Sequence, residues 1–463
     1  MAFVVAGFAA ASALVVNPAT NRLWRPTEHV NFHDVASLNA VTGAGLAIGA
    51  FVVGMLIRRF KPRGAEVTSC ALPVFFAALI FLCDRLILAC LGLPLWVADP
   101  ECHYRHRANA VRQWTSRTGA KRISINSWGH HDDDFPKKKP AGELRGLILG
   151  DSVVMGHGLK YTETFAHQLE NLMTGLKTRF SSFQIINTGV QGYSTYQEVE
   201  VLKRSFVFDP DFVVVGFFFN DVNEPFVVNR NMGGEGIDFH GIRQAGTFAV
   251  AWLLNESGFG RLATKLGEKQ VERRIQEGWK TMTRADVMTR SVDDAKVSHG
   301  WNLVLSSLEE IHRICTSNRL PLVLLVFPAT DQLLEPERQS PQLILRRFAE
   351  DDGLGLLDMT PILEDVVLGS RDPHLPGRHA TDRSAVRELF IDRGHLSPRG
   401  HRVVAQALGE WVEQVVLKNK PWPRDRRLPS SVVIEEEPEG QITALGFDSG
   451  DIGQAFDVKT PNY

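Results

Sequence analysis

The sequence predicts an α/β domain with a doubly wound parallel sheet, preceded by N-terminal transmembrane helices. Unbroken apolar runs such as residues 212–219 (FVVVGFFF) are typical of strands that are buried on both faces of a parallel sheet. Strand-like and helix-like patterns alternate between about residues 141 and 420, as they do in βαβ units. Residues 38–57 form a stretch of twenty residues without a charge, long enough to cross a bilayer.

The apolar residues concentrate before residue 97, in three runs. Leu38–Ile57 is the best candidate for a membrane span, and Cys70–Val97 is a second, although Asp84 and Arg85 lie near its middle. A single charge at a bilayer centre costs roughly 2.5–3.5 kcal/mol, part of which an adjacent opposite charge offsets. Met1–Val16 is apolar but short for a span, and no basic residue precedes it, which argues against a cleaved signal peptide. The alternative is that these runs are buried helices of a soluble domain.

The loop at residues 58–63 (RRFKPR) gives the expected orientation. Its four cationic residues favour the cytoplasmic side, which places everything after about Pro100 outside the cytoplasm. Three arginines soon after the last run weaken this bias: Arg105, Arg107 and Arg112.

Overall composition excludes some classes of protein. The net charge is −2 and 22% of the residues are charged, so nothing indicates a nucleic-acid partner. Five cysteines do not form a disulfide framework, and we expect Cys102 and Cys315 to be unpaired. The oligomeric state does not follow from the sequence.

We expect four regions along the chain. Residues 1–98 form the membrane-anchoring helices and residues 99–140 a polar linker into the domain. Residues 141–420 form the α/β domain, with an excursion from the sheet at 222–300. Residues 421–463 form a loosely ordered tail.

Within the linker, residues 126–134 (NSWGHHDDD) combine two histidines with three carboxylates. Neighbouring residues on an extended chain point to opposite faces, so these five side chains cannot all reach one ion. We therefore expect a solvated turn there and no metal site.

The expected elements of the domain follow from apolar runs and helical spacing. Strands are predicted at residues 144–149, 183–187, 212–219, 320–327 and 354–357. Helices are predicted at residues 165–176, 196–204, 271–282, 302–316, 359–368 and 398–416, with a polar loop at 371–385.

The polar residues at the predicted strand ends suit acyl-transfer chemistry, which needs a nucleophile, a base, a group that orients the base, and donors for an oxyanion. Ser152 follows the first strand, and the spacing of Asp392 and His395 can place a carboxylate against imidazole Nδ1. Gly192 follows the second strand and can offer an unobstructed N–H, and Asn220 follows the third and can offer a side-chain amide. Because parallel strands end at one edge of the sheet, we expect these groups to converge.

Four ordered motifs resemble the signature blocks of the SGNH (GDSL-type) hydrolase family. These are residues 150–156 (GDSVVMG), 187–192 (NTGVQG), 216–221 (GFFFND) and 392–395 (DRGH). The resemblance runs from about residue 126 to residue 417. The third motif has three phenylalanines before its asparagine, more than many members of the family, which concerns the lining of the pocket more than the chemistry.

The resemblance implies a three-layer, flavodoxin-like fold and a set of roles. Ser152 would be the nucleophile, His395 the base and Asp392 the group that orients it. The backbone N–H groups of Ser152 and Gly192 and the side chain of Asn220 would form the oxyanion hole. Asp151 and Asp221 would support the site.

Each of these residues also has an ordinary structural explanation. Ser152 could cap a helix, His395 could cap a loop, and Asn220 and Asp221 are common turn formers. Their occurrence together in this order favours the catalytic interpretation. We interpret the remaining histidines as surface or packing residues, namely His157, His312, His374, His379 and His401.

The expected function is a serine esterase that removes O-acyl groups from a carbohydrate or lipid of the cell envelope, without metal or cofactor. The expected partners are this acyl ester and a membrane, with the catalytic domain outside the cytoplasm. One alternative is an acyltransferase that uses the same residues to acylate a polysaccharide hydroxyl. Another is a non-catalytic binding or assembly module.

Overall fold

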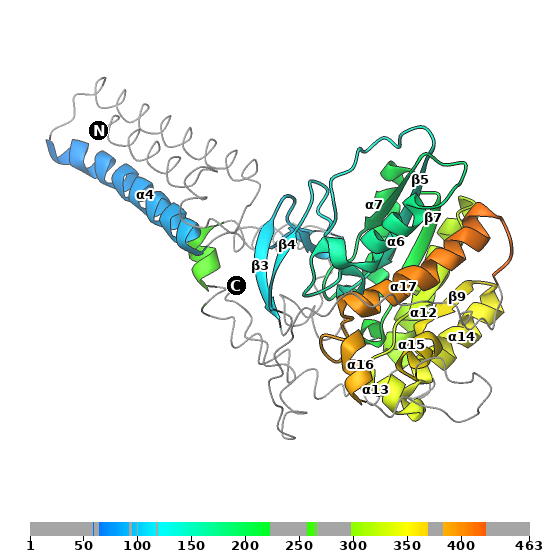
Figure 1. The fold of residues 1–463 in the computed structure, drawn as a ribbon. Helices are drawn as coiled ribbons and strands as arrows, with labels where there is room; N and C mark the ends of the chain where they lie inside the picture. The colour runs from blue at the N-terminus through cyan, green and yellow to red at the C-terminus, as the bar shows by residue number, and fades with distance from the viewer. Residues whose placement is uncertain are drawn as a thin grey trace.

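A five-stranded parallel sheet forms the centre of the domain (Figure 1). The computed structural model describes residues 59, 64–91, 95–99, 101–116, 119–222, 257–263, 266, 298–368 and 383–422. The strand order is β6-β5-β7-β8-β9, and every neighbouring pair is parallel. The strands are β5 (Glu143–Gly150), β6 (Ser182–Asn187), β7 (Phe212–Phe217), β8 (Leu322–Val326) and β9 (Gly355–Asp358).

This order confirms the prediction of a doubly wound parallel sheet. The first strand of the sheet, β5, lies between β6 and β7, so the order of the strands reverses beside it. In open α/β sheets, ligands bind in the crevice beyond the carboxyl ends of the strands at such a reversal. The crevice expected here lies between the ends of β5 and β7.

Helices connect the strands, and most of them match the predicted ranges within a few residues. The longer ones are α6 (Phe165–Thr174), α7 (Thr195–Ser205), α12 (Ser298–Ser317), α14 (Ser340–Asp352), α15 (Met359–Leu368) and α17 (Pro398–Trp411), which continues as a π-helical segment (Val412–Leu417). Short helices are α5 (Ser152–Met155), α13 (Thr330–Leu334) and α16 (Arg383–Leu389), with 3₁₀ turns at Tyr161–Glu163, Phe206–Phe208, Phe219–Val222 (η3) and Pro336–Arg338.

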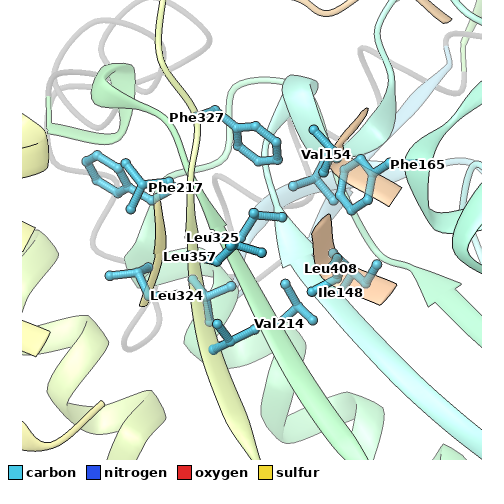
Figure 2. Close-up of a cluster of buried hydrophobic side chains, with 14 of the residues drawn as sticks. Ile148, Val154, Phe165, Val214, Phe217, Leu324, Leu325, Phe327, Leu357 and Leu408 are labelled. Carbon is cyan, nitrogen blue, oxygen red and sulfur yellow. The ribbon is translucent and has the colours of Figure 1, made fainter. Parts of the chain in front are cut away.

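The sheet is apolar on both faces because each face is covered by a pair of helices. On one face, Ile148 and Val214 are paired in register and gather with Phe165 of α6 and Leu408 of α17 (Figure 2). α6 packs against α17 beside them, and α7 packs against α12. On the other face, Phe217 stacks on Trp301 of α12, with ring centroids 5.9 Å apart. These two layers of side chains explain why the strands have no polar alternation.

The segment expected to be a linker, together with the last residues of the expected membrane region, forms two antiparallel hairpins. β1 (Trp96–Asp99) pairs with β2 (His103–His106), and β3 (Val111–Ser116) pairs with β4 (Gly119–Ser124). Ile123 and Ile125 pack on Met155 of α5, so this segment contacts the element that begins with Ser152.

Residues 126–134 are not the solvated turn that we predicted. His131 and Asp132 are buried: His131 Nδ1 lies 2.8 Å from the Met155 carbonyl oxygen, and Asp132 accepts the Asn187 N–H at 3.0 Å. Residues 127–132 form turns and bends, not an extended chain, so side-chain alternation does not apply to them, and tertiary packing buries both side chains. Among the described residues, no group of three or more His, Cys, Asp or Glu side chains has the arrangement of a metal site.

The second predicted membrane span, Cys70–Val97, does not form one element. Helix α4 (Gly64–Leu91) covers most of it, and β1 begins at Trp96. Asp84 and Arg85 of α4 are buried and paired with one another, and the Phe259 N–H donates to Asp84 at 2.9 Å. None of the helices in the described part of the chain has the length and apolarity to cross a membrane, so that expectation is not supported there.

Several expectations fall outside the described residues. These are the apolar runs Met1–Val16 and Leu38–Ile57, the loop at 58–63 apart from Arg59, most of the 222–300 excursion including the helix at 271–282, most of the polar loop at 371–385, and residues 423–463 of the tail.

Candidate active site

The turn after β5 places Ser152 at the edge of the sheet, as the first residue of α5. Gly150 ends the strand, and a Cβ there would lie 2.1 Å from Val154 Cγ2, so the turn closes only without a side chain. Asp151, rather than Ser152, caps α5, because its Oδ1 accepts the Val153 N–H at 2.8 Å. The Ser152 hydroxyl is therefore not needed to cap the helix.

His395 lies between the Ser152 hydroxyl and the Asp392 carboxylate. His395 Nε2 is 2.8 Å from Ser152 Oγ, and His395 Nδ1 is 2.7 Å from Asp392 Oδ2. Ser152 and His395 are 243 positions apart in the chain, and the loop between α16 and α17 brings them together. This geometry leaves one imidazole nitrogen to accept the serine proton while the other donates to the carboxylate.

The loop that carries Asp392 is braced by the same carboxylate. Asp392 Oδ1 accepts the N–H groups of Gly394 and His395, each at 2.8 Å. Burial raises the pKa of Asp392, but the adjacent His395 and these hydrogen bonds outweigh it, so the pKa lies well below its ordinary value. Asp392 is therefore ionised throughout the neutral range, as the orienting role requires.

Asn220 lies in η3, directly after β7, and is held by the turn of the neighbouring strand. Its Nδ2 donates to Asp151 Oδ2 at 3.0 Å. An amide nitrogen carries two hydrogens, so this bond fixes the side chain and leaves one hydrogen for another acceptor. Asp151 thus fixes the orientation of the Asn220 side chain.

Gly192 lies in the loop between β6 and α7 with a φ of +73°, a conformation that favours glycine. Asp221 points to a different place from its neighbour Asn220. Its Oδ2 accepts from the Thr195 hydroxyl at 3.1 Å, and its carbonyl accepts from Ser194 at 2.8 Å, so it ties η3 to the start of α7.

Gly189 sets the spacing between this loop and α5. A Cβ at this position would lie 2.4 Å from the Met155 nitrogen and 2.9 Å from the Asp151 oxygen. The backbones of the two segments are thus in direct contact, with Ser152 carried on one of them.

His157 is a site residue that the sequence argument missed. Its ring stacks on that of His395, with centroids 4.5 Å apart and planes at 27°, and its Nδ1 contacts the Gln191 side chain. Burial, and then the positive charge that His395 can carry, lower the pKa of His157 to about 3, so it is neutral at physiological pH. His401, by contrast, is a packing residue as expected: it stacks on Phe165 and accepts the Phe165 N–H at 2.9 Å.

Glu198 of α7 is a second residue that the sequence argument missed. It is fully buried, and neither carboxyl oxygen has a hydrogen-bond partner among the described residues. Burial, and then the charge of Asp151, raise its pKa well above the ordinary value. A helix-spaced acid in an apolar pattern gives no sign of this, because burial depends on the packing of α7 against the sheet.

Glu198 gives a prediction on stability. Because Glu198 keeps its proton in the folded state but loses it in the unfolded state above about pH 4.5, it lowers stability as pH rises through that value. Glu198→Gln has no proton to lose. We expect its melting temperature to exceed that of the wild type by a few degrees at pH 8 and to match it near pH 4.5.

The matched control for this prediction is Glu350→Gln, which changes an exposed acid on α14. Thermal unfolding of the three proteins from pH 4.5 to 8 measures the difference. A gain for Glu198→Gln that does not depend on pH would contradict the proposed burial of a protonated Glu198.

No family model and no curated protein matches the chain. Solved structures similar to it include a member of the lipolytic protein G-D-S-L family from Veillonella parvula DSM 2008, at 10% identity and a TM-score of 0.32, covering 58% of this chain and 97% of the other. A catalytic mutant of an acetylxylan esterase from Geobacillus stearothermophilus is 13% identical, with a TM-score of 0.33, covering 61% and 97%. A two-domain esterase active on acetylated mannans is 17% identical, with a TM-score of 0.33, covering 62% and 53%. Values this low do not establish a shared family.

Proposed function

We propose that the protein is a serine esterase that cleaves O-acyl esters through an acyl-enzyme. The observation that carries the proposal is the continuous hydrogen-bonded path from Ser152 Oγ to His395 Nε2 at 2.8 Å, and from His395 Nδ1 to Asp392 Oδ2 at 2.7 Å. A serine, a histidine and a carboxylate in this order form the arrangement that activates a hydroxyl for attack on a carbonyl carbon.

In the first half-reaction, His395 Nε2 accepts the hydroxyl proton as Ser152 Oγ attacks the ester carbonyl carbon. The carbonyl π electrons move to oxygen, and the N–H groups of Ser152 and Gly192 and the second Nδ2 hydrogen of Asn220 are the proposed donors to that oxyanion. As the C–O bond to the alcohol breaks, the imidazolium gives its proton to the leaving oxygen. Asp392 stabilises the imidazolium while it exists.

In the second half-reaction, His395 accepts a proton from water as the water oxygen attacks the acyl-enzyme. Collapse of the second tetrahedral intermediate releases the carboxylic acid, and Ser152 Oγ recovers its proton from His395. This proposed chemistry uses the side chains and backbone named here and one water molecule.

The substrate that we propose is an O-acyl ester of a carbohydrate or lipid of the cell envelope. This part of the proposal rests on the sequence motifs and on the charge-free run Leu38–Ile57. Acid release from acetylated polysaccharides and from phospholipids, each measured against a short-chain aryl ester, distinguishes the two classes.

We also propose, from the same run and the basic loop at 58–63, that the chain is attached to a membrane with its catalytic domain outside the cytoplasm. Digestion of the domain by protease added to cells stripped of any outer membrane (spheroplasts) supports this topology, and protection until the inner membrane is lysed contradicts it.

The direct test of the nucleophile is labelling with a fluorophosphonate, followed by mapping of the modified peptide. We expect the label on Ser152 and none on a Ser152→Ala protein. A wild-type protein that neither takes the label nor hydrolyses any short-chain aryl ester contradicts the proposal.

The expected pH dependence follows from the three side chains. Only neutral His395 can accept the serine proton, so kcat/KM should fall about tenfold for each unit of pH below the pH at which this imidazole becomes protonated. Asp392, with its pKa well below the ordinary value, and His157, with a pKa of about 3, stay in one form from pH 5 to 8. The profile should therefore fit a single ionisation; a flat profile, or a slope of two, contradicts these assignments.

A further inference from the structure

The loop that carries Gly192 is a tight turn that is hydrogen-bonded to the β1–β2 hairpin. The Tyr193 N–H donates to the Val190 carbonyl at 3.2 Å, which closes a four-residue turn with Gln191 and Gly192 at its centre. The Tyr104 hydroxyl of β2 donates to the Gln191 carbonyl at 2.8 Å. The Tyr193 hydroxyl donates in return to the Tyr104 carbonyl, and the two rings meet edge to face with centroids 5.3 Å apart.

The Gln191 carbonyl and the Gly192 N–H belong to the same peptide group. No cis peptide bond occurs among the described residues, and in a planar trans peptide the C=O and N–H point in opposite directions. A bond that fixes the Gln191 carbonyl therefore also fixes the direction of the Gly192 N–H. Among the hydrogen bonds of the described residues, none engages that N–H.

The peptide group between Gln191 and Gly192 can adopt two orientations in a turn of this kind. β-Turns of types I and II differ mainly by a flip of the central peptide, and the positive φ of Gly192, +73°, is the value that type II requires. A flip would turn the Gly192 N–H away from its present direction. The Tyr104 hydroxyl bonds the carbonyl in only one of the two orientations.

A donor to the carbonyl also acts through the peptide bond. Hydrogen bonds in a chain polarise one another by roughly 10–30% each, so an N–H whose carbonyl is already engaged is a stronger donor. The Tyr104 hydroxyl thus affects both the direction and the donor strength of the Gly192 N–H, which the proposed mechanism places against the oxyanion.

We propose that Tyr104 is a positioning residue for the oxyanion hole, which holds the Gln191–Gly192 peptide with its N–H available to the developing oxyanion. This inference rests on the proposed esterase function. Under this proposal a residue of the β1–β2 hairpin, which lies outside the four motifs, affects the rate of the reaction.

The hairpin does not depend on this hydroxyl for its attachment. Arg204 of α7 donates to both carboxylate oxygens of Asp99, each at 2.7 Å, and the Gln197 side chain donates to the Cys102 carbonyl at 2.8 Å. These bonds join β1 and the turn before β2 to α7. Removal of the Tyr104 hydroxyl should therefore leave the hairpin in place and free only the peptide group.

The experiment compares kcat and KM of the full chain for a short-chain aryl ester in Tyr104→Phe, Arg204→Gln and the wild type. We expect Tyr104→Phe to lower kcat roughly 5- to 20-fold with KM unchanged, less than the 10²- to 10³-fold that is typical for loss of a whole oxyanion donor. The second-order rate of fluorophosphonate labelling should fall by a similar factor, because the phosphonyl oxygen uses the same donors. Arg204→Gln weakens the attachment of the hairpin. It should lower the melting temperature and change kcat little.

Replacement of Tyr104 by 4-aminophenylalanine gives the rescue. Its aniline N–H can donate from nearly the same place, so kcat should recover most of the loss seen in Tyr104→Phe. This variant also keeps the inference falsifiable where the phenylalanine protein does not fold, because its kcat should then be close to that of the wild type.

Three outcomes overturn the inference. Tyr104→Phe with unchanged kcat and a lower melting temperature assigns the hydroxyl to stability alone, as does an equal loss of kcat in Arg204→Gln. A folded 4-aminophenylalanine variant that does not recover kcat also shows that the Tyr104 hydroxyl does not position the peptide. These results leave the esterase proposal intact, because the wild type is active in all of them. A wild type that is inactive and is not labelled at Ser152 overturns both proposals.

Discussion

Ser152→Ala is expected to lower kcat for a short-chain aryl ester by roughly 10⁴- to 10⁶-fold and to leave the fold unchanged. The variant removes the atom that attacks the carbonyl, and the remaining donors and binding contacts give only residual catalysis. His395→Ala should cost about as much, since Ser152 Oγ and His395 Nε2, 2.8 Å apart, act as one unit. The measurement is initial-rate kinetics, with the melting temperature as the check on folding.

Ser306→Ala and His312→Ala are the matched controls, because both residues lie on α12, apart from the motifs that carry the site. Each should keep the wild-type kcat. Hydrolysis by purified Ser152→Ala above one thousandth of the wild-type rate, free of contaminating esterase, rules out Ser152 as the nucleophile.

After the loss of Ser152 or His395, Asp392→Asn has the next largest expected effect, a fall in kcat of roughly 10³- to 10⁴-fold. The asparagine oxygen can still accept the N–H groups of Gly394 and His395, so the loop keeps its shape. Its amide, however, can donate to His395 Nδ1, which places the imidazole proton on Nε2, facing Ser152. A histidine in that form cannot accept the serine proton.

The control for this variant is Asp351→Asn, at an exposed position near the end of α14. Asp392→Asn should retain fluorophosphonate labelling only at a greatly reduced rate. A variant with more than a tenth of the wild-type kcat shows that the carboxylate is dispensable, and it removes Asp392 from the proposed site.

The sheet and its covering helices could be predicted because their signals are local. An unbroken apolar run such as residues 212–217 is typical of a strand that is buried on both faces. The glycine-rich turn after β5 restricts the conformations of the segment that follows the strand. The position of Ser152 followed for a related reason, because the ends of parallel strands share one edge of the sheet. Asp392 and His395 lie in the loop between α16 and α17, and their approach to Ser152 was expected from the order of the four motifs.

What the sequence argument missed depends on packing between distant segments. The strands of the two hairpins are short and mostly polar, and apolar side chains on them such as Ile123 and Tyr104 are buried among residues of α5 and of the Val190–Tyr193 turn. The hydrogen bond of Tyr104 could not be predicted for this reason, since its partner is a backbone carbonyl 87 positions away. His157 and Glu198 were missed because stacking and burial are tertiary properties, and no motif spacing encodes them.

The direct contact of Gly189 with the backbone at Asp151 and Met155 has a consequence for the history of the protein. The backbone on either side of Ser152 lies against Gly189 with no room for even one methyl group, so the two segments cannot shift independently. A lineage could lengthen a surface loop away from the site, and that change would be absorbed elsewhere. At this contact the only tolerated accommodation is a paired one, in which both strand ends shift at once.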